Sequence, residues 1–336
     1  MSRWKRRVRR AVGRLLPPRP GAVILGYHRL ADPHTAAGAE PSAMCVSPTC
    51  FEAQMGSLRR LGRPVSLRHL GAALEAGAPV RGMIAVTFDD GYEDVLRVAL
   101  PVLERERIPA TVFFVAGSPG ESFWWDRLAA LLEGADAAVP FRVRLGASEF
   151  VWPGVGGAEQ LRVRLNRALR VLDAAARTNV LDRLADVWDT RSPGDVPLPR
   201  ALTSAEARRL LDSSWVEAGA HTISHPPLAE VAPRRRRDEV VGGRDALRAM
   251  LETDVDVFSY PHGSVNARTI DLVREAGYEL ACISASDSVR PGVEKLALPR
   301  LWVRNEAGRA FTGRMRRYLG RASRLGSKPA DGRARG

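Results

Sequence analysis

The segment Met83-Ile-Ala-Val-Thr-Phe-Asp-Asp-Gly-Tyr92 passes from a short apolar run directly into two adjacent carboxylates and a glycine. A run of six such residues, rich in β-branched side chains and bounded by a turn signal, is typical of a buried strand. In an extended strand Asp89 and Asp90 would point to opposite faces, but a turn begun at Gly91 lets both carboxylates approach one point. The stretch therefore predicts an interior strand that delivers two acidic groups to one end of a sheet.

Short apolar runs of the same kind recur along the chain and alternate with helical segments. Capping-box pairs predict helix starts at Thr49 and Thr203, and glycines suit helix ends at 62 and 277. Strand and helix alternation favours an α/β fold, a distorted (β/α) barrel that is TIM-like with about seven parallel strands. The expected strands are 22–26, 83–88, 110–115, 215–220, 255–259, 279–284 and 301–303.

Residues 121–200 interrupt this rhythm and are expected to form a mostly helical insertion, with its longest helix at 161–184 and a loop at 192–199. The rest of the body, residues 21–308, is long enough to bury the core of a single catalytic domain.

The chemically suggestive residues all follow expected strands at their carboxyl ends, which is the rim where barrel enzymes gather catalytic side chains. They are His28, Asp89, Asp90, His221, the turn at 261–263, and Asp287. His221 and His225 lie four residues apart in His-Thr-Ile-Ser-His-Pro. One Asp and two His supply the three protein ligands of a catalytic zinc site, and the second Asp is free to take a proton from water.

Three motifs, in order, resemble the first three of the polysaccharide deacetylase family: Thr-Phe-Asp-Asp-Gly at 87–91, His-Thr-x-x-His-Pro at 221–226 and Phe-Ser-Tyr-Pro-His-Gly at 258–263. The resemblance runs from about Val23 to about Val303. It implies that Asp90, His221 and His225 bind a divalent metal, Zn²⁺ before Co²⁺, Ni²⁺ or Mn²⁺, and that Asp89 is the general base. It also implies that the third motif, with Tyr260, Pro261, His262 and Gly263, contacts the substrate or its oxyanion.

The expected proton donor departs from the family pattern. Many members carry a late Leu-x-His, whereas this chain reads Leu296-Ala-Leu-Pro-Arg300. A subgroup acting on poly-N-acetylglucosamine has an early Tyr-His, which Tyr27-His28 resembles, so His28 is the candidate general acid. The alternatives are that His28 only closes its strand and that His262 is the donor.

A second departure concerns the cation beside the base. Phe258 replaces the Arg that opens the third motif in many members. Arg300 is expected to take that catalytic role by pairing with Asp89 and holding it ionised, although an Arg after Pro can also be solvated. Asp287 is a weaker candidate to orient Arg300 or His28. Trp124, Trp125 and Trp302 either stack on sugars or belong to the core.

The formal net charge of +13 comes from the two ends of the chain. Residues 1–20 form a basic N-terminal arm and residues 309–336 a basic C-terminal tail, each with a charge of +8, which leaves −3 for the body. Both ends also carry an amphipathic helical pattern, at 4–15 and at 311–325. We expect either peripheral membrane contact, or a disordered arm, or a helix docked on its own domain. The run of four arginines at 234–237 is expected to be a solvated helix start.

Compartment signals are weak. Leu15 and Leu16 run into prolines, so the apolar stretch of a signal peptide is missing, and no segment approaches the ~20 apolar residues of a membrane span. Cys45, Cys50 and Cys282 are odd in number and are expected to be free thiols. A cytoplasmic location, peripheral at the inner membrane face, is expected, whereas family members are usually exported.

The expected function is metal-dependent removal of N-acetyl groups from an N-acetylhexosamine-containing glycan or a lipid-linked glycan precursor. The alternatives are an O-deacetylase of sugar esters and a member of the same fold that binds a glycan or metal without turnover. Nucleic-acid binding by the basic tails is disfavoured, because the body is slightly acidic and carries no RNA or DNA motif.

Overall fold

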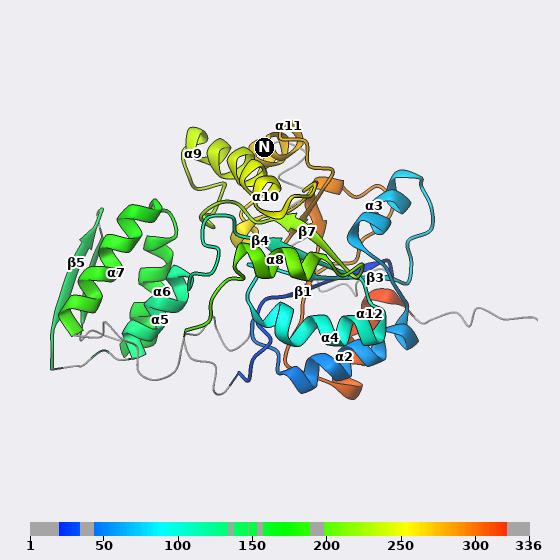
Figure 1. Ribbon diagram of the computed structural model, residues 1–336, viewed down its shortest axis with the longest axis horizontal. Coiled ribbons are helices and arrows are strands. Elements are labelled where there is room, and N and C mark those ends of the chain that lie inside the picture. The colour runs from blue at the N-terminus through cyan, green and yellow to red at the C-terminus, as the bar shows by residue number, and fades with distance from the viewer. Residues whose placement is uncertain are drawn as a thin grey trace, which may run out of the picture.

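The computed structural model describes residues 20–33, 44–133, 135, 138–146, 148–152, 157–188 and 198–320. Its centre is a parallel sheet with the strand order β10-β9-β8-β7-β4-β3-β1-β11, and β2 pairs with β3 beside it. The sheet curls nearly closed into a barrel with helices around it (Figure 1), as the sequence predicted. Its strands are β1 (Val23–Tyr27), β2 (Arg63–Pro64), β3 (Met83–Phe88), β4 (Ala110–Phe114), β7 (Val216–Ala220), β8 (Val257–Ser259), β9 (Leu280–Ile283), β10 (Leu298–Pro299) and β11 (Leu301–Trp302).

The two edges of this sheet are consecutive pieces of the same chain segment. β10 pairs with β9 through Leu298 opposite Cys282, while β11 pairs with β1 through Leu301 opposite Leu25. One residue, Arg300, separates the two pieces. The chain therefore crosses from one edge of the sheet to the other at Arg300 and joins the barrel there. All seven expected strands are present, and the sequence missed the short β2 and β10.

Helices surround the barrel, and their ends follow simple capping rules. The helix α8 starts with the predicted capping box of Thr203 and Glu206. The start of α2 was predicted two residues late, because Pro48 suits the first helical position and the Ser47 hydroxyl accepts the N–H of Cys50. The barrel helices are α2 (Pro48–Leu61), α3 (Leu67–Glu75), α4 (Leu100–Glu106), α8 (Ser204–Leu211), α9 (Pro233–Arg237), α10 (Gly243–Leu251), α11 (Ala267–Glu275) and α12 (Gly308–Leu319).

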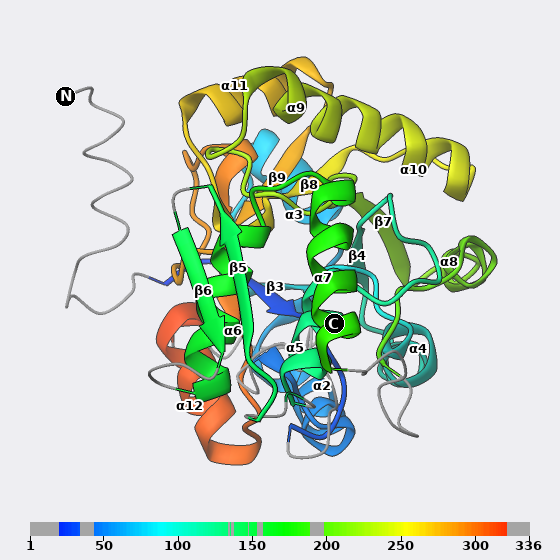
Figure 2. The same ribbon diagram turned by 90° about the vertical axis from the view of Figure 1, so that its left-hand side faces the viewer.

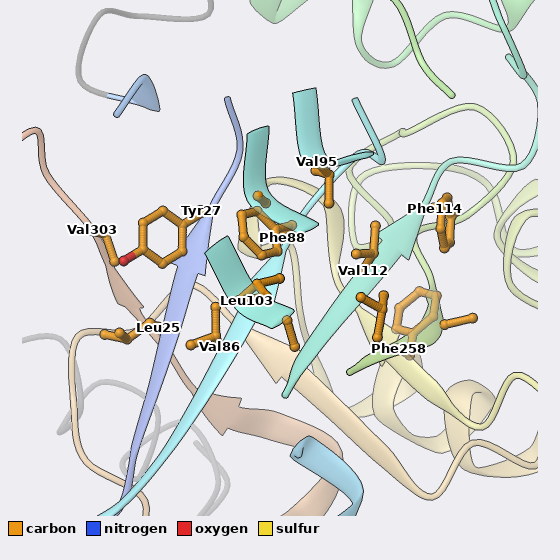
Figure 3. Close-up of a cluster of buried hydrophobic side chains, with 14 of the residues drawn as sticks. Leu25, Tyr27, Val86, Phe88, Val95, Leu103, Val112, Phe114, Phe258 and Val303 are labelled. Carbon is orange, nitrogen blue, oxygen red and sulfur yellow. The ribbon is translucent and has the colours of Figure 1, made fainter. Parts of the chain in front are cut away.

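Alternation along the strands divides the buried side chains into two clusters. Leu25, Val86 and Val112 belong to the larger one, between the strands and the surrounding helices (Figure 3). The intervening residues, such as Ile24 and Ala85, form a second cluster with the apolar side of α3. Polar residues of this second face, described below, form the floor of the site. The three cysteines form no disulfide with one another, as expected.

Residues 121–200 form the insertion, which stands beside one end of the barrel (Figures 1 and 2). It has its own apolar core and comprises α5 (Trp124–Glu133), the antiparallel hairpin β5 (Phe141–Leu145) and β6 (Ser148–Trp152), α6 (Gly157–Leu169) and α7 (Ala174–Trp188). The prediction of one helix over 161–184 is wrong. Asp173 accepts the N–H of Ala176 and so starts a new helix. The hairpin was missed, and most of the loop expected at 192–199 lies outside the described residues.

The helix α12 packs on the protein itself. Phe311, Met315 and Leu319, which belong to the predicted amphipathic stripe, are buried, and the helix lies against α2. Of the readings left open for the C-terminal tail, the docked helix is therefore correct over these residues, and an outward membrane-facing stripe there is wrong. The arm at 1–19 and the tail beyond 320 lie outside the described residues. Within the described part of the chain, no helix is long and apolar enough to cross a membrane.

Candidate active site

Two carboxylates lie at the carboxyl end of β3. Asp89 donates its backbone N–H to Tyr27 O, which continues the pairing with β1. Asp90 and Gly91 then both adopt positive φ, 70° and 81°. This turn brings both side chains to one place, because Asp89 Oδ2 and Asp90 Oδ1 lie 3.8 and 3.7 Å from the same atom, His221 Nε2. Both carboxylates therefore approach one point, as the sequence predicted from Gly91.

His221 follows β7 directly and is oriented by the neighbouring strand. Its Nδ1 lies 2.8 Å from the carbonyl oxygen of Ser259. Since a carbonyl only accepts, Nδ1 must carry the proton and Nε2 offers its lone pair toward the carboxylates. His225 is placed by the loop that follows His221, in which the backbone N–H of His225 donates to Thr222 Oγ1. Glu239 holds the same loop by accepting the N–H groups of residues 223 and 224.

Asp90, His221 and His225 form a compact set of candidate metal ligands, and all three are buried. His225 Nε2 lies 3.1 Å from His221 Nε2 and 3.5 Å from Asp90 Oδ1. Ligands about 2.0–2.1 Å from one tetrahedral zinc ion lie roughly 3.3 Å from each other, so these spacings fit a zinc site. Burial lowers the pKa of both imidazoles, so both are neutral, as ligation requires.

Arg300 forms a bidentate pair with Asp89 inside the barrel. Its two terminal nitrogens lie 2.6 and 2.7 Å from the two carboxylate oxygens. They also donate to Thr87 Oγ1 and Ser259 Oγ, which fixes the plane of the guanidinium. Burial alone would raise the pKa of Asp89, but Arg300, and to a lesser degree His221, hold that pKa below its usual range. Asp89 is therefore an ionised carboxylate in a fixed orientation.

Backbone strain gathers at this site. Among the described residues, six that are not glycine have positive φ, and two of these end helices. The other four are Asp90, Thr222, His225 and His262. Left-handed backbone is costly for such residues and persists where the surrounding structure enforces it, which is common in functional sites.

Two histidines lie beside the candidate ligands as possible proton donors. His28 Nε2 is 4.0 Å from Asp89 Oδ2, and its ring packs on Trp302 with a centroid distance of 4.5 Å. The ring of His262 packs on His225, also at 4.5 Å. Burial lowers the pKa of His28 to about 3 and that of His262 to about 4. Both side chains are thus neutral at rest, and either needs a proton delivered to it before it can donate one.

Most polar groups of the turn at 260–263 are hydrogen-bonded within the protein. The Tyr260 hydroxyl donates to Leu296 O, and its N–H donates to Cys282 O. Gly263 donates its N–H back to Tyr260 O, and Pro261 has none. These residues therefore shape the turn that presents His262, and the oxyanion contact predicted for the turn stays a prediction for His262 alone.

The family profile described as polysaccharide deacetylase matches residues 76–138 and 159–281. The chain belongs to the polysaccharide deacetylase family. The matched span includes both aspartates, His221, His225 and the turn at 260–263. His28 and Arg300 lie outside it, so their roles depend on the geometry of this chain.

Individual relatives of this family member are more distant in sequence. The chain is 24% identical over 269 residues to the poly-β-1,6-N-acetyl-D-glucosamine N-deacetylase of Escherichia coli strain K12, and the match covers 78% of this chain. It covers 34% of that protein, so the chain spans about a third of its relative's length.

Solved structures with the same fold include IcaB from Ammonifex degensii, with a TM-score of 0.56 and 20% identity over 85% of this chain and 93% of that one. The deacetylase PplD of Streptococcus pyogenes, solved in complex with acetate, has a TM-score of 0.53 and 17% identity over 86% of this chain and 94% of that one.

The candidate site opens into a cleft of about 620 Å³. Trp124, Trp125 and Trp302 all line it. Trp125 is largely buried: its ring stacks on Phe123 and packs on His225, and its N–H donates to the Tyr92 hydroxyl. The far wall comes from the insertion and was missed by sequence reasoning. It consists of Arg162, Asn166 and Arg167 of α6 and of Arg170, which directly follows that helix. Their spacing along one face of a helix was the available signal.

The insertion is tied to the loop that carries His225. Arg177 of α7 donates to Ser224 O, and Arg170 pairs with Glu230. The arginine run at 234–237 takes part: Arg235 donates to the carbonyl oxygens of residues 171 and 172, and Arg236 is buried and bonds to Leu228 O. The expectation of a solvated run is therefore wrong for these two arginines.

The prediction that Asp287 orients Arg300 or His28 is also wrong. This carboxylate pairs with Arg290, three residues along the same loop, and accepts the N–H of Ser288. A carboxylate satisfied within its own loop does not orient Arg300 or His28.

Proposed function

We propose that this protein is a metal-dependent deacetylase that removes N-acetyl groups from an N-acetylhexosamine-containing glycan. One observation carries the proposal. Three neutral or anionic ligands, Asp90, His221 and His225, converge at metal-ligand spacing next to a fourth group, Asp89, that Arg300 keeps ionised.

Asp90, His221 and His225 would hold a divalent ion, which would supply Lewis acidity toward the acetyl oxygen and lower the pKa of a bound water toward about 7. Asp89 takes the proton of the attacking water, since its Oδ2 lies on the ligand side of the cleft, 3.8 Å from His221 Nε2. Arg300 keeps Asp89 anionic and fixes its direction, so the base does not reorganise during the reaction.

The amine that leaves needs a proton, and His28 is the proposed donor. Its Nε2 lies 4.0 Å from Asp89 Oδ2, so a proton accepted by Asp89 has a short path to the imidazole. The guanidinium of Arg300 weakens Asp89 as a resting place for that proton, which favours its passage to His28 and then to the amine. His262, whose ring packs on His225, is the competing donor.

The presence of a buried donor favours amide over ester substrates. An alkoxide leaves an ester far more readily than an amine leaves an amide, so only the amide strictly needs a proton at departure. The E. coli relative is named a poly-β-1,6-N-acetyl-D-glucosamine N-deacetylase, and this name supports a GlcNAc-containing substrate for the present chain. A lipid-linked substrate, membrane contact and a cytoplasmic location stay predictions from the sequence.

The test is acetate release from N-acetylglucosamine oligomers by the purified protein. We expect release to stop after treatment with a chelator and to return with Zn²⁺ or Co²⁺. An enzyme that binds the metal but releases no acetate from any acetylated glycan would overturn the proposal in favour of a binding protein of the same fold.

A further inference from the structure

A second cleft, of about 1430 Å³, adjoins the active site. Met44 and Trp302 line both clefts, so the two are parts of one groove. Trp302 stands at the junction, because its ring packs on His28 on the side of the active site. The second cleft continues over β11 and α12, where its lining includes Asn305 and Tyr318. A substrate longer than one sugar can therefore extend from the reacting centre across Trp302.

The lining of the second cleft is cationic. Arg304, Arg314 and Arg317 line it, and no Asp or Glu does so among the described residues. Arg314 has a structural task, since it pairs with Glu306 and donates to Trp302 O. Arg304 and Arg317 are exposed and make no ion pair with the described residues. Two guanidinium groups thus face the cleft without a counter-ion.

The opposite wall of the groove is also cationic. Arg162 of α6 pairs with Glu159, and Arg170, just after that helix, pairs with Glu230. Arg167 has no carboxylate partner in the part of the chain that the structure describes. The carboxylate lining the first cleft, Asp89, is already neutralised by Arg300. The groove is therefore positive on both sides of the reacting centre.

We propose that the second cleft is a subsite for an anionic group of the substrate, a carboxylate or a phosphate attached next to the reacting N-acetylhexosamine. The inference rests on the proposed function and narrows its substrate class. Guanidinium groups match carboxylate and phosphate oxygens in a fork geometry, and Arg is favoured where such groups are recognised. A neutral N-acetylglucosamine polymer would leave Arg304 and Arg317 without a partner inside the groove.

The test compares two charge-reversal pairs on or next to the same helix. Arg304→Glu with Arg317→Glu alters the cleft, whereas Arg309→Glu with Arg316→Glu makes the same change of charge at exposed positions outside its lining. Acetate release is measured on three substrates: a neutral N-acetylglucosamine tetramer, a tetrasaccharide alternating glucuronate with N-acetylglucosamine, and N-acetylglucosamine 1-diphosphate bearing a short alkyl chain.

We expect the wild type to have a higher kcat/KM on one of the two charged substrates than on the neutral tetramer. Which of the two it prefers shows whether the subsite binds a carboxylate or a phosphate. The cleft pair should reduce the ratio of kcat/KM on that substrate to kcat/KM on the neutral tetramer about tenfold. The control pair should leave the ratio within about twofold. Equal ratios in both pairs, or a wild type that prefers the neutral tetramer, would overturn the subsite.

A binding measurement separates failure of the subsite from failure of the proposed function. Isothermal titration of the metal-loaded Asp89→Asn variant with the two charged substrates should show affinity that falls with added sodium chloride and with the cleft pair. The same titration of the metal-stripped wild type serves if Asp89→Asn does not fold. Salt-independent affinity, or none, rejects the subsite even if the neutral tetramer is deacetylated. Affinity without acetate release from any substrate rejects the enzyme and keeps the subsite.

Discussion

Arg300 and Asp89 face each other with two hydrogen bonds of 2.6 and 2.7 Å, although 211 positions separate them in the sequence. Both side chains are buried, so the charge of each is balanced mainly by the other. The pair joins the segment that closes the barrel to the strand that carries both aspartates. The state of the proposed base thus depends on the last strand of the fold.

Replacing Asp89 by Asn tests its role as base. The amide keeps the shape of the side chain but cannot take a proton, so kcat for acetate release should fall by about 10²–10⁴-fold. The metal content, measured by mass spectrometry of the dialysed protein, should stay at the wild-type level. If the metal is lost instead, Asp89 and Asp90 have exchanged roles.

Replacing Arg300 by Met tests how much its ion pair with Asp89 contributes to the stability of the fold. Breaking a buried pair leaves an uncompensated charge, so the free energy of unfolding should fall by about 3–5 kcal/mol. Urea unfolding followed by circular dichroism measures it. Adding Asp89→Asn to Arg300→Met should restore part of the loss, since the orphaned carboxylate disappears. If the two changes are additive, the charges are not coupled.

Replacing His221 or His225 by Ala should abolish stoichiometric zinc binding. Each change removes one of three ligands, and two ligands hold the ion far more weakly. The matched control is His69→Ala, because His69 is exposed on α3, away from the cleft. Zinc titration with a competing chromophoric chelator provides the measurement. Wild-type affinity in either variant would mean that the ligand set is wrong.

A comparison of His28→Ala with His262→Ala identifies the proton donor. The variant that lacks the donor should lose about 10²–10⁴-fold in kcat on an acetamide. It should lose much less on 4-nitrophenyl acetate, whose phenolate leaves without a proton. We expect this split for His28→Ala. Finding it only for His262→Ala would assign the donor to the turn after β8.

Stability of the metal-free protein should depend on the buried histidines. Burial lowers the pKa of His28 to about 3 and that of His262 to about 4, and it also lowers the pKa of His221 and His225. In the unfolded chain these groups take up protons below about pH 6.5, whereas in the folded chain they stay neutral. Their contribution to stability is therefore complete above pH 6.5 and is lost as the pH falls toward 4.

The slope of this loss can be measured. Each such histidine contributes about 1.4 kcal/mol per pH unit between the two pKa values. Urea unfolding of the chelator-treated protein across this range should show a steep decline, and His28→Gln should make it shallower by one histidine's share. An unchanged slope in His28→Gln would contradict the burial argument for His28.

The sequence predicted the centre of this molecule better than its periphery. Strand ends, the paired aspartates at 89–90 and the imidazoles at 221 and 225 were readable because each follows a short apolar run in the chain. Arg300 has no motif of its own, and the only sequence signal for its role is that Phe258 stands where many family members have an arginine. Ser259, which binds both Arg300 and His221, was missed because a serine at a strand end has no distinctive pattern.

Features made by tertiary contact were out of reach. The hairpin β5–β6 and the break before α7 are short-range choices inside a segment of generally helical composition. The helix α12 has the same amphipathic pattern whether it faces lipid or a neighbouring helix, and only the position of α2 decides between them. Likewise, the arginines of α6 are ordinary surface residues in sequence until the insertion is placed over the cleft.

Because the chain crosses between the two sheet edges at Arg300, the proposed site is completed only late in the synthesis of the chain. A nascent polypeptide that ends before this point already contains every proposed metal ligand, yet its sheet has two open edges and Asp89 has no counter-ion. Only when residues 298–302 have been made and docked do the edge strands and the base reach their final state together. Incomplete translation products that stop before residue 300 should therefore release no acetate.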